Sequence, residues 1–374
     1  MTLYIILALI ITGTILLYFS TGRMAQFGAS PKGARLERIL KSPNYDGTAF
    51  VNKHNVTLSF SMSDYGSMLK HMIFGDEQRT PEITIPVHNL TRSDFDGDTN
   101  EDLHFTWLGH STVLLEIDGK TILTDPVFSK RTSPVSFIGP SRFHPVPLAI
   151  EALPPLDVVI ISHDHYDHLD MKTVKKLAES GVTFVTALGV GAHLESWDID
   201  AKQIVELDWW DEYKISDSFT LACCPSQHFS GRSWFSKNNQ TLWSTWSIIG
   251  SKRRVFFCGD TGEIPEFDSI GQKYGPFDLT LMKIGAYNSE YWPTIHLTPE
   301  QSARLHQKLQ GKVMMPIHWG TFNLALHSWN EPINRLIDAA QKENINLVTP
   351  IPGQRININS LPQPERWWDN KTKP

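Results

Sequence analysis

The sequence has little cysteine, no excess of basic charge and only one long apolar run. Its three cysteines include the neighbours Cys223 and Cys224, which rarely pair with each other, and no Cys-x-x-Cys spacing occurs. A disulfide scaffold is therefore not expected, which fits a reducing compartment. The formal net charge of -6 offers no basic field, so we expect no nucleic-acid partner.

The long apolar run lies at the N-terminus. Residues 3–19 are apolar apart from a Thr-Gly-Thr interruption. About 17 residues at 1.5 Å rise barely cross a bilayer core of about 30 Å. Residues 1–22 are therefore predicted to form a membrane anchor or an uncleaved signal. A cleaved signal peptide is the alternative, although no basic residue precedes the run and no clear small-residue cleavage site follows it.

Basic side chains follow the apolar run, at Arg23, Lys32, Arg35, Arg38 and Lys41. The positive-inside rule favours a cytoplasmic position for this flank over a periplasmic one. The same stretch could also contact anionic lipid headgroups. We therefore expect membrane association through the N-terminal segment, with the catalytic domain on the cytoplasmic side.

The remaining chain divides into three parts. Residues 23–100 are rich in turn residues, as in the Ser-Pro-Asn-Tyr-Asp-Gly stretch at 42–47, and are predicted to form an irregular extension. Residues 101–360 are predicted to form the catalytic domain, and residues 361–374 a C-terminal tail. Two strands and an Asp118-Gly119 hairpin turn open that domain.

Strands then alternate with helices through the domain. Residues 157–161 are an unbroken apolar run, typical of a strand buried on both faces. Further strands are expected in the ranges 103–108, 112–117, 121–125, 182–186, 221–224, 244–249, 255–258, 279–284 and 313–316, and helices in the ranges 171–180, 298–309 and 331–343. Hairpins followed by this alternation indicate a layered α/β fold.

The strongest chemical signal directly follows the strand at 157–161. The segment 162–170, Ser-His-Asp-His-Tyr-Asp-His-Leu-Asp, offers three imidazoles and several carboxylates. In an extended segment His163 and His165 project to the same side, while Asp167 and His168 can turn towards a second position. Nitrogen and carboxylate ligands suit zinc. A solvated polar loop is the alternative, but it does not explain why this pattern follows a buried strand.

This motif resembles that of the metallo-β-lactamase superfamily. The resemblance implies an αβ/βα sandwich, in which two mixed β-sheets carry helices on their outer faces. It also implies further ligands at His228, Asp260 and His318, each of which follows an expected strand. By the same resemblance, one ion is held by His163, His165 and His228. The other is held by Asp167, His168 and His318, with Asp260 bridging both.

Asp125, at the end of the strand at 121–125, matches a carboxylate that orients a ligating histidine from behind. A turn residue before Pro126 is the alternative. His296 matches a histidine that lines the substrate cavity, and the alternative is an ordinary polar residue just outside a helix N-terminus. Tyr287 and Tyr291 on the loop before it could line an acyl groove. Phe229, Trp234 and Phe235 could contact lipid, although packing explains such aromatics equally well.

Several motifs resemble one branch, the N-acyl-phosphatidylethanolamine-hydrolysing phospholipases D and their bacterial relatives. They are Trp-Leu-Gly-His-Ser-Thr at 107–112, Leu-Thr-Asp-Pro at 123–126, Leu-Asp-Trp-Trp at 207–210, Gly-Pro-Phe-Asp-Leu at 275–279 and Ile-His-Trp-Gly-Thr-Phe at 317–322. The resemblance implies two zinc ions per chain. A metal-bound hydroxide would attack phosphorus, releasing N-acylethanolamine and phosphatidic acid.

Within that chemistry, Asp260 and Asp167 are the expected catalytic carboxylates. The expected partners are a phospholipid and a membrane, and a homodimer is plausible by resemblance. A related hydrolase of another ester, lactone, β-lactam or soluble phosphodiester is the alternative. A membrane-tethered scaffold or sensor that has lost activity is disfavoured, because every ligand position is filled.

Overall fold

The structure is a computed structural model that describes residues 2–20, 24–56, 62–96, 102–233 and 237–369. Its centre is a pair of mixed β-sheets. The seven-stranded sheet has the order β13 (Arg355–Asn357), β1 (Leu103–Gly109), β2 (Thr112–Ile117), β3 (Lys120–Thr124), β4 (Val158–Ile161), β5 (Thr183–Ala187) and β6 (Ile204–Leu207). The six-stranded sheet has the order β12 (Gly311–Ile317), β11 (Phe277–Lys283), β10 (Arg254–Phe257), β9 (Thr245–Ile249), β8 (Phe219–Cys224) and β7 (Glu212–Ser216).

Each sheet joins an antiparallel part to a parallel part. Strands β1 to β3 pair antiparallel, whereas β3 to β6 run parallel. In the other sheet β10 to β12 run parallel and β7 to β10 antiparallel. Parallel strands end at the same edge of a sheet, so the loops that follow them gather there.

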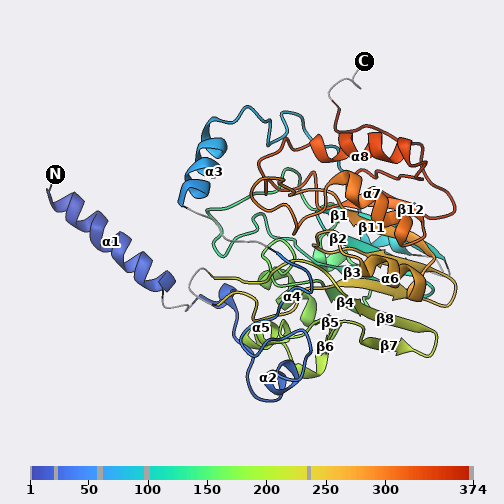
Figure 1. The fold of residues 1–374 in the computed structure, drawn as a ribbon, viewed down its shortest axis with the longest axis horizontal. Coiled ribbons are helices and arrows are strands. Elements are labelled where there is room, and N and C mark those ends of the chain that lie inside the picture. Colours follow the sequence, from blue (N-terminus) through green and yellow to red (C-terminus); the bar gives the residue numbers. More distant parts are fainter. Residues whose placement is uncertain (1, 21–23, 57–61, 97–101, 234–236, 370–374) are drawn as a thin grey trace.

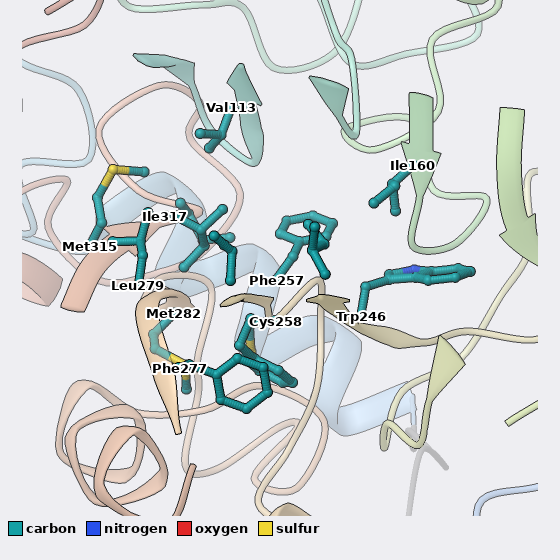
Figure 2. Close-up of a cluster of buried hydrophobic side chains, with 14 of the residues drawn as sticks. Val113, Ile160, Trp246, Phe257, Cys258, Phe277, Leu279, Met282, Met315 and Ile317 are labelled. Atoms are coloured by element: carbon teal, nitrogen blue, oxygen red, sulfur yellow. The ribbon is translucent and has the colours of Figure 1, made fainter. Parts of the chain in front are cut away.

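The main core lies between the two sheets. Strand β4 shows why, because its side chains alternate between the two faces of the sheet. Val158 and Ile160 belong to the cluster shared with the six-stranded sheet, while Val159 and Ile161 belong to a second cluster on the outer face. Figure 2 shows Ile160 on one side of this core, with Phe257 and Trp246 opposite. Burial on both faces explains the unbroken apolar sequence of β4.

Helices cover the outer faces, as Figure 1 shows. The helices α4 (Met171–Ala178) and α5 (Gly191–Ser196) pack on the seven-stranded sheet through the outer cluster. The other sheet is covered by α6 (Glu266–Tyr274) and α7 (Pro299–Lys308), with α8 (Glu331–Lys342) packed against α7. The predicted αβ/βα sandwich is therefore confirmed.

The segment 23–100 was expected to be irregular, and this expectation is wrong in two places. It contains α2 (Gly33–Ile39) and α3 (Met62–Phe74). Its Ile39, Phe50 and Ile85 side chains are buried in the core between the sheets. The segment thus packs against the sandwich. In the predicted tail, Trp367 and Trp368 are also buried, and the Trp367 ring stacks on Trp319.

At the N-terminus, α1 (Thr2–Ser20) is a helix whose described apolar side chains are exposed. Among the residues that the structure describes, no helix is long and apolar enough to cross a membrane. The anchor predicted for residues 1–22 therefore receives no support from this finding. Membrane association and its orientation stay predictions.

Candidate metal centre

The predicted ligands meet at one edge of the sandwich, where five strands end. Asp125 follows β3 and the His-x-His motif follows β4, while His228, Asp260 and His318 follow β8, β10 and β12. Their ligand atoms fall into overlapping groups, within each of which all atoms lie within 4.8 Å of one another. The structure thus brings all seven predicted ligands together, listed as His163, His165, Asp167, His168, His228, Asp260 and His318.

One group consists of three imidazoles. The Nε2 atom of His163 lies 2.9 Å from Nδ1 of His165, which lies 3.2 Å from Nε2 of His228. Donor atoms on a tetrahedral zinc with bonds of about 2.0–2.1 Å lie roughly 3.3 Å apart. The outer nitrogens of two rings have partners: Nδ1 of His163 contacts the hydroxyl of Ser162, and Nδ1 of His228 contacts the carbonyl of Ile295. These contacts turn the other nitrogens of both rings towards the group.

A second group lies beside the first. The Oδ2 atom of Asp167 lies 3.3 Å from Nε2 of His168 and 3.3 Å from Nε2 of His318. Asp260 stands between the two groups. Its Oδ1 lies 3.2 Å from Nε2 of His318, and its Oδ2 lies 3.6 Å from His168 and 3.7 Å from His228. One carboxylate therefore reaches both groups, as a bridging ligand must.

The buried atoms at this centre fit a cation. In the described part of the chain, Nε2 of His168, Nε2 of His318 and Oδ1 of Asp260 are buried without a hydrogen-bond partner. A buried polar atom without a partner is costly, so such atoms call for an ion or a ligand. Imidazole and carboxylate donors in this arrangement suit a divalent ion such as zinc.

The electrostatics of the centre agree with this interpretation. Burial by itself would raise the pKa of the Asp260 carboxyl, yet His318, Lys283 and His168 hold that pKa well below its usual range. Burial by itself would lower the pKa of His168, but the carboxylates of Asp167, Asp260 and Asp125 raise it well above its usual value. These three carboxylates thus favour a positive charge at the centre, which metal ions would supply.

Asp125 lies behind His168, as the sequence predicted. Its buried carboxylate accepts hydrogen bonds from the backbone and hydroxyl of Ser162 at 2.7 and 2.6 Å. Its Oδ2 also lies 2.6 Å from Nδ1 of His168. A carboxylate in this position accepts a hydrogen bond from the protonated Nδ1, which leaves Nε2 of the ring free to bind a metal.

His110 is a site residue that sequence reasoning missed. It sits in the turn between β1 and β2 with a positive φ of 54°, and its side chain is buried. Its Nε2 lies 2.9 Å from Oδ2 of Asp167, and its ring centroid lies 4.0 Å from that of His318. Burial, with His318 close by, lowers the pKa of His110 to about 3. A neutral ring therefore donates to Asp167. The signal was present in the motif at 107–112, but a histidine in a hairpin turn resembles an ordinary surface residue.

His296 reaches the centre from the loop that precedes α7. Its Nδ1 lies 3.6 Å from Oδ2 of Asp260, and 13% of its side chain is exposed. Lys283, the last residue of β11, is completely buried beside it. Burial and the Lys283 ammonium lower the pKa of His296 well below its usual value, so the ring is neutral. Sequence reasoning missed Lys283, because a charged residue at a strand end is ordinarily solvated.

The two tyrosines that were expected to line an acyl groove make other contacts in the structure. The hydroxyl of Tyr287 donates to Glu331 at 2.7 Å, and its ring stacks on His327. Tyr291 is buried, and its hydroxyl reaches Ser67 of α3 at 2.8 Å. Both side chains thus pack between structural elements. Phe229 lies against the site, 4.5 Å from the His165 ring centroid, whereas Trp234 and Phe235 lie outside the described residues.

Two segments of the N-terminal extension, one before α3 and one after it in the sequence, lie next to the metal centre. Before α3, the side-chain amide of Asn52 forms two hydrogen bonds with the backbone of His228. It donates to the carbonyl at 2.7 Å and accepts from the N–H at 3.0 Å. After α3, Arg79 lines a hollow together with His110 and His318. Its guanidinium also contacts the backbone carbonyl of Met72 in α3. The C-terminal end of α3 is therefore linked to the rim of the site through Arg79.

Comparisons with known proteins agree with the geometry. Residues 120–319 match a family described as a beta-lactamase superfamily domain. The chain is 42% identical over 361 residues to an uncharacterized protein of Mycobacterium tuberculosis, covering 95% of each chain. It is 36% identical over 285 residues to N-acyl-phosphatidylethanolamine-hydrolyzing phospholipase D 1 of Caenorhabditis elegans, covering 72% of this chain and 79% of that one. A novel metallo hydrolase of the archaeon Ignicoccus hospitalis shares the fold, with a TM-score of 0.52 and 21% identity over 68% of this chain and 97% of that chain.

Proposed function

Because this chain belongs to the metallo-β-lactamase superfamily and is a metal-dependent hydrolase, we propose that it is a phosphodiesterase of phospholipase D type. Its substrate is N-acyl-phosphatidylethanolamine, and its products are N-acylethanolamine and phosphatidic acid. One observation carries the proposal of two-metal hydrolysis: the Asp260 carboxylate reaches both groups of ligand atoms. The substrate rests on the 36% identity to the nematode phospholipase.

Two zinc ions fit the ligand atoms described above. His163, His165 and His228 would hold one, and Asp167, His168 and His318 the other, with Asp260 shared. When bound, two such ions lower the pKa of water and stabilise negative charge on phosphoryl oxygens. In the net reaction water adds its oxygen to phosphorus, the P–O bond to the ethanolamine group breaks, and a proton of water ends on the leaving oxygen.

The chain's own residues would position this reaction. The Asp260 carboxylate, whose pKa is held low, stays ionised and can orient the attacking water by accepting a hydrogen bond from it. His110 fixes the orientation of Asp167 through its 2.9 Å contact. Arg79 lines a small hollow beside His110 and His318, and its positive charge at the rim would attract an anionic phosphodiester to the site. This arrangement favours a charged phosphodiester over a neutral ester or lactone.

The surface of the molecule supports a lipid substrate. Helix α1 exposes apolar side chains all along its length, among them Tyr4, Ile6, Leu9, Ile10 and Leu16. Helix α3, tied to the rim of the site, exposes Tyr65, Leu69, Met72, Ile73 and Phe74. Both helices project from the same side of the sandwich in Figure 1. Large exposed apolar surfaces mark contacts with partners or membranes. We infer that this side rests on a lipid surface, while the expected homodimer and the absence of a nucleic-acid partner stay predictions.

The decisive experiment incubates zinc-loaded protein with N-acyl-phosphatidylethanolamine in mixed micelles and follows both products by mass spectrometry. A His163→Ala variant and a chelated sample are the controls. We expect both products in equal amounts, and their loss in both controls. Zinc-dependent turnover of lactones, β-lactams or carboxylic esters with no release of phosphatidic acid would overturn the lipid assignment and leave the hydrolase assignment standing.

Arg79→Gln separates charged from neutral substrates. We expect the variant to raise KM for the phospholipid and for a soluble phosphodiester, but to leave any weak turnover of a neutral ester unchanged. Arg304→Gln is the matched control, because Arg304 is exposed and pairs with Glu263. An equal loss of activity on charged and neutral substrates would exclude a role of Arg79 in binding the anion.

A further inference from the structure

Lys283 is a cation buried at the metal centre that the proposed reaction has not used. Its side chain has no exposed surface, although lysine is rarely buried without a partner. An ammonium group carries three donors and no acceptor. Two acceptor atoms lie within hydrogen-bond distance of Nζ of Lys283, the carbonyl oxygen of Gly285 at 2.7 Å and Nδ1 of His296 at 2.5 Å, while Oδ1 of Asp260 lies 3.9 Å away as an ion-pair partner.

The contact with His296 has a consequence for the imidazole. A protonated Lys283 can only donate, so Nδ1 of His296 accepts from it and the proton of a neutral ring sits on Nε2. Nδ1 is then not available to a metal ion, even though it lies 3.6 Å from Oδ2 of Asp260. It also leaves an N–H donor on a ring of which 13% is exposed, whereas Lys283 itself is closed off.

We propose that Lys283 is a positioning residue that fixes the His296 tautomer, so that His296 presents its Nε2–H to the phosphodiester. The donor is then available to the phosphoryl oxygen or to the leaving oxygen of the ethanolamine group. The kinetic part of this inference rests on the proposed function, whereas the tautomer does not.

The tautomer is tested by proton–nitrogen NMR of the zinc-loaded protein with isotope-labelled histidine. Signals of His296 are assigned by their absence from a His296→Gln variant. We expect a protonated Nε2 and a bare Nδ1 in the wild-type protein. Lys283→Met, which has no donor, should convert the ring to a mixture or to the Nδ1–H form, while Lys283→Gln, which keeps N–H donors, should retain the wild-type form. A wild-type ring with its proton on Nδ1 would overturn the inference without any variant.

Kinetics on the phospholipid test whether Lys283 acts through His296. We expect Lys283→Met to lower kcat about 10- to 100-fold with little change in KM, within the range that proton-donor groups contribute. The double variant Lys283→Met/His296→Gln should be no slower than His296→Gln alone, because the two residues act as one unit. Independent, multiplicative losses would overturn the inference.

Two controls test whether Lys283→Met changes zinc binding or the packing of β11. Bound zinc, measured by elemental analysis, should be the same in Lys283→Met as in the wild type, and loss of zinc would mean that Lys283 supports the ligands instead. Met282→Leu, at the neighbouring buried position of β11, controls for disturbance of the strand and should keep the wild-type tautomer. If neither the wild type nor any variant turns over the phospholipid, the proposed function fails, while the NMR comparison still decides the tautomer.

Discussion

At the scale of single residues, the candidate ligands could be found in the sequence because each follows an apolar strand. His163 and His318 stand within two residues of the ends of β4 and β12, and His228 lies four residues beyond the end of β8, so each follows a strand that the core requires. His110 and Lys283 could not be found in this way. One occupies a hairpin turn, and the other is a charge that only the fold reveals to be buried. Their roles depend on atoms that approach from distant segments, which no local pattern encodes.

Substitution of Asp125 tests whether its carboxylate strengthens zinc binding by holding His168 in place. We expect Asp125→Asn to lower zinc affinity about 10- to 100-fold, because an amide cannot accept from Ser162 and from His168 in the same way. Competition with a fluorescent zinc chelator measures the affinity. Asp200→Asn is the matched control, since Asp200 only caps a short helix by accepting from Lys202. Unchanged affinity in Asp125→Asn would exclude this supporting role.

His306 predicts a pH dependence of stability that is separate from the metal centre. Burial lowers its pKa to about 4, and its Nδ1 accepts from the hydroxyl of Thr280 at 2.7 Å. The unfolded state therefore binds the proton more readily than the folded state, so stability falls as pH drops below the unfolded pKa of about 6.5. The loss from this histidine should reach about 2 kcal/mol at pH 5.

Urea unfolding of the wild type and of His306→Gln at several pH values measures this effect. The amide oxygen of glutamine can still accept from Thr280 but does not titrate. Stability of the variant should therefore fall less steeply between pH 6.5 and pH 5, and the difference between the two proteins cancels contributions from other histidines. Parallel curves would show that His306 does not titrate in this range.

At the scale of elements, most strands and the helices α4, α7 and α8 follow from the sequence. Apolar runs and caps mark them: Asp170 caps α4, and Thr298 forms a capping box with Gln301 at the start of α7. Helix α6 escaped prediction although its Phe267, Ile270 and Tyr274 are buried. Other elements escaped because they lack a buried apolar pattern. Strand β7 is a half-exposed edge strand, β13 has only three residues, and α3 presents its apolar side chains to the exterior.

The exposed face of α3 predicts a difference between lipid and soluble substrates. We expect a triple variant, Leu69→Ser, Ile73→Ser and Phe74→Ser, to weaken binding to phospholipid vesicles about 10-fold or more, because each apolar side chain gains about 1.5–3 kcal/mol when fully buried. Hydrolysis of a soluble phosphodiester should stay within about two-fold of wild type. Vesicle sedimentation and steady-state kinetics measure the two effects.

Leu40→Ser is the matched control for α3, because Leu40 is an exposed apolar residue at the end of α2. It should leave both vesicle binding and soluble hydrolysis unchanged. If the triple variant binds vesicles as the wild type does, α3 does not contact the lipid surface, and its apolar face must serve another partner.

At the scale of the whole molecule, the metal centre adds a connection between parts of the fold that are also joined by core packing and by hydrogen bonds, such as those from Ser244 to the carbonyl of Ser162. His163, His165, Asp167 and His168 follow a strand of the seven-stranded sheet, whereas His228, Asp260 and His318 follow strands of the six-stranded sheet. Asn52 ties the N-terminal extension to the same place through His228. Bound ions would therefore cross-link both sheets at the edge where their loops meet.

Removal of the metal should accordingly lower the Tm of the whole domain. An ion present at a thousandfold excess over its Kd stabilises the folded state by about 4 kcal/mol. For a domain of this size that corresponds to a shift of roughly 8–16 °C per ion. Chelation should lower the Tm in scanning calorimetry, and added zinc should restore it. In His163→Ala the shift should be smaller, because one group of ligands is incomplete. A Tm that does not respond to chelation or zinc would mean that the ligand atoms bind no ion tightly and that the other contacts between the sheets hold them together.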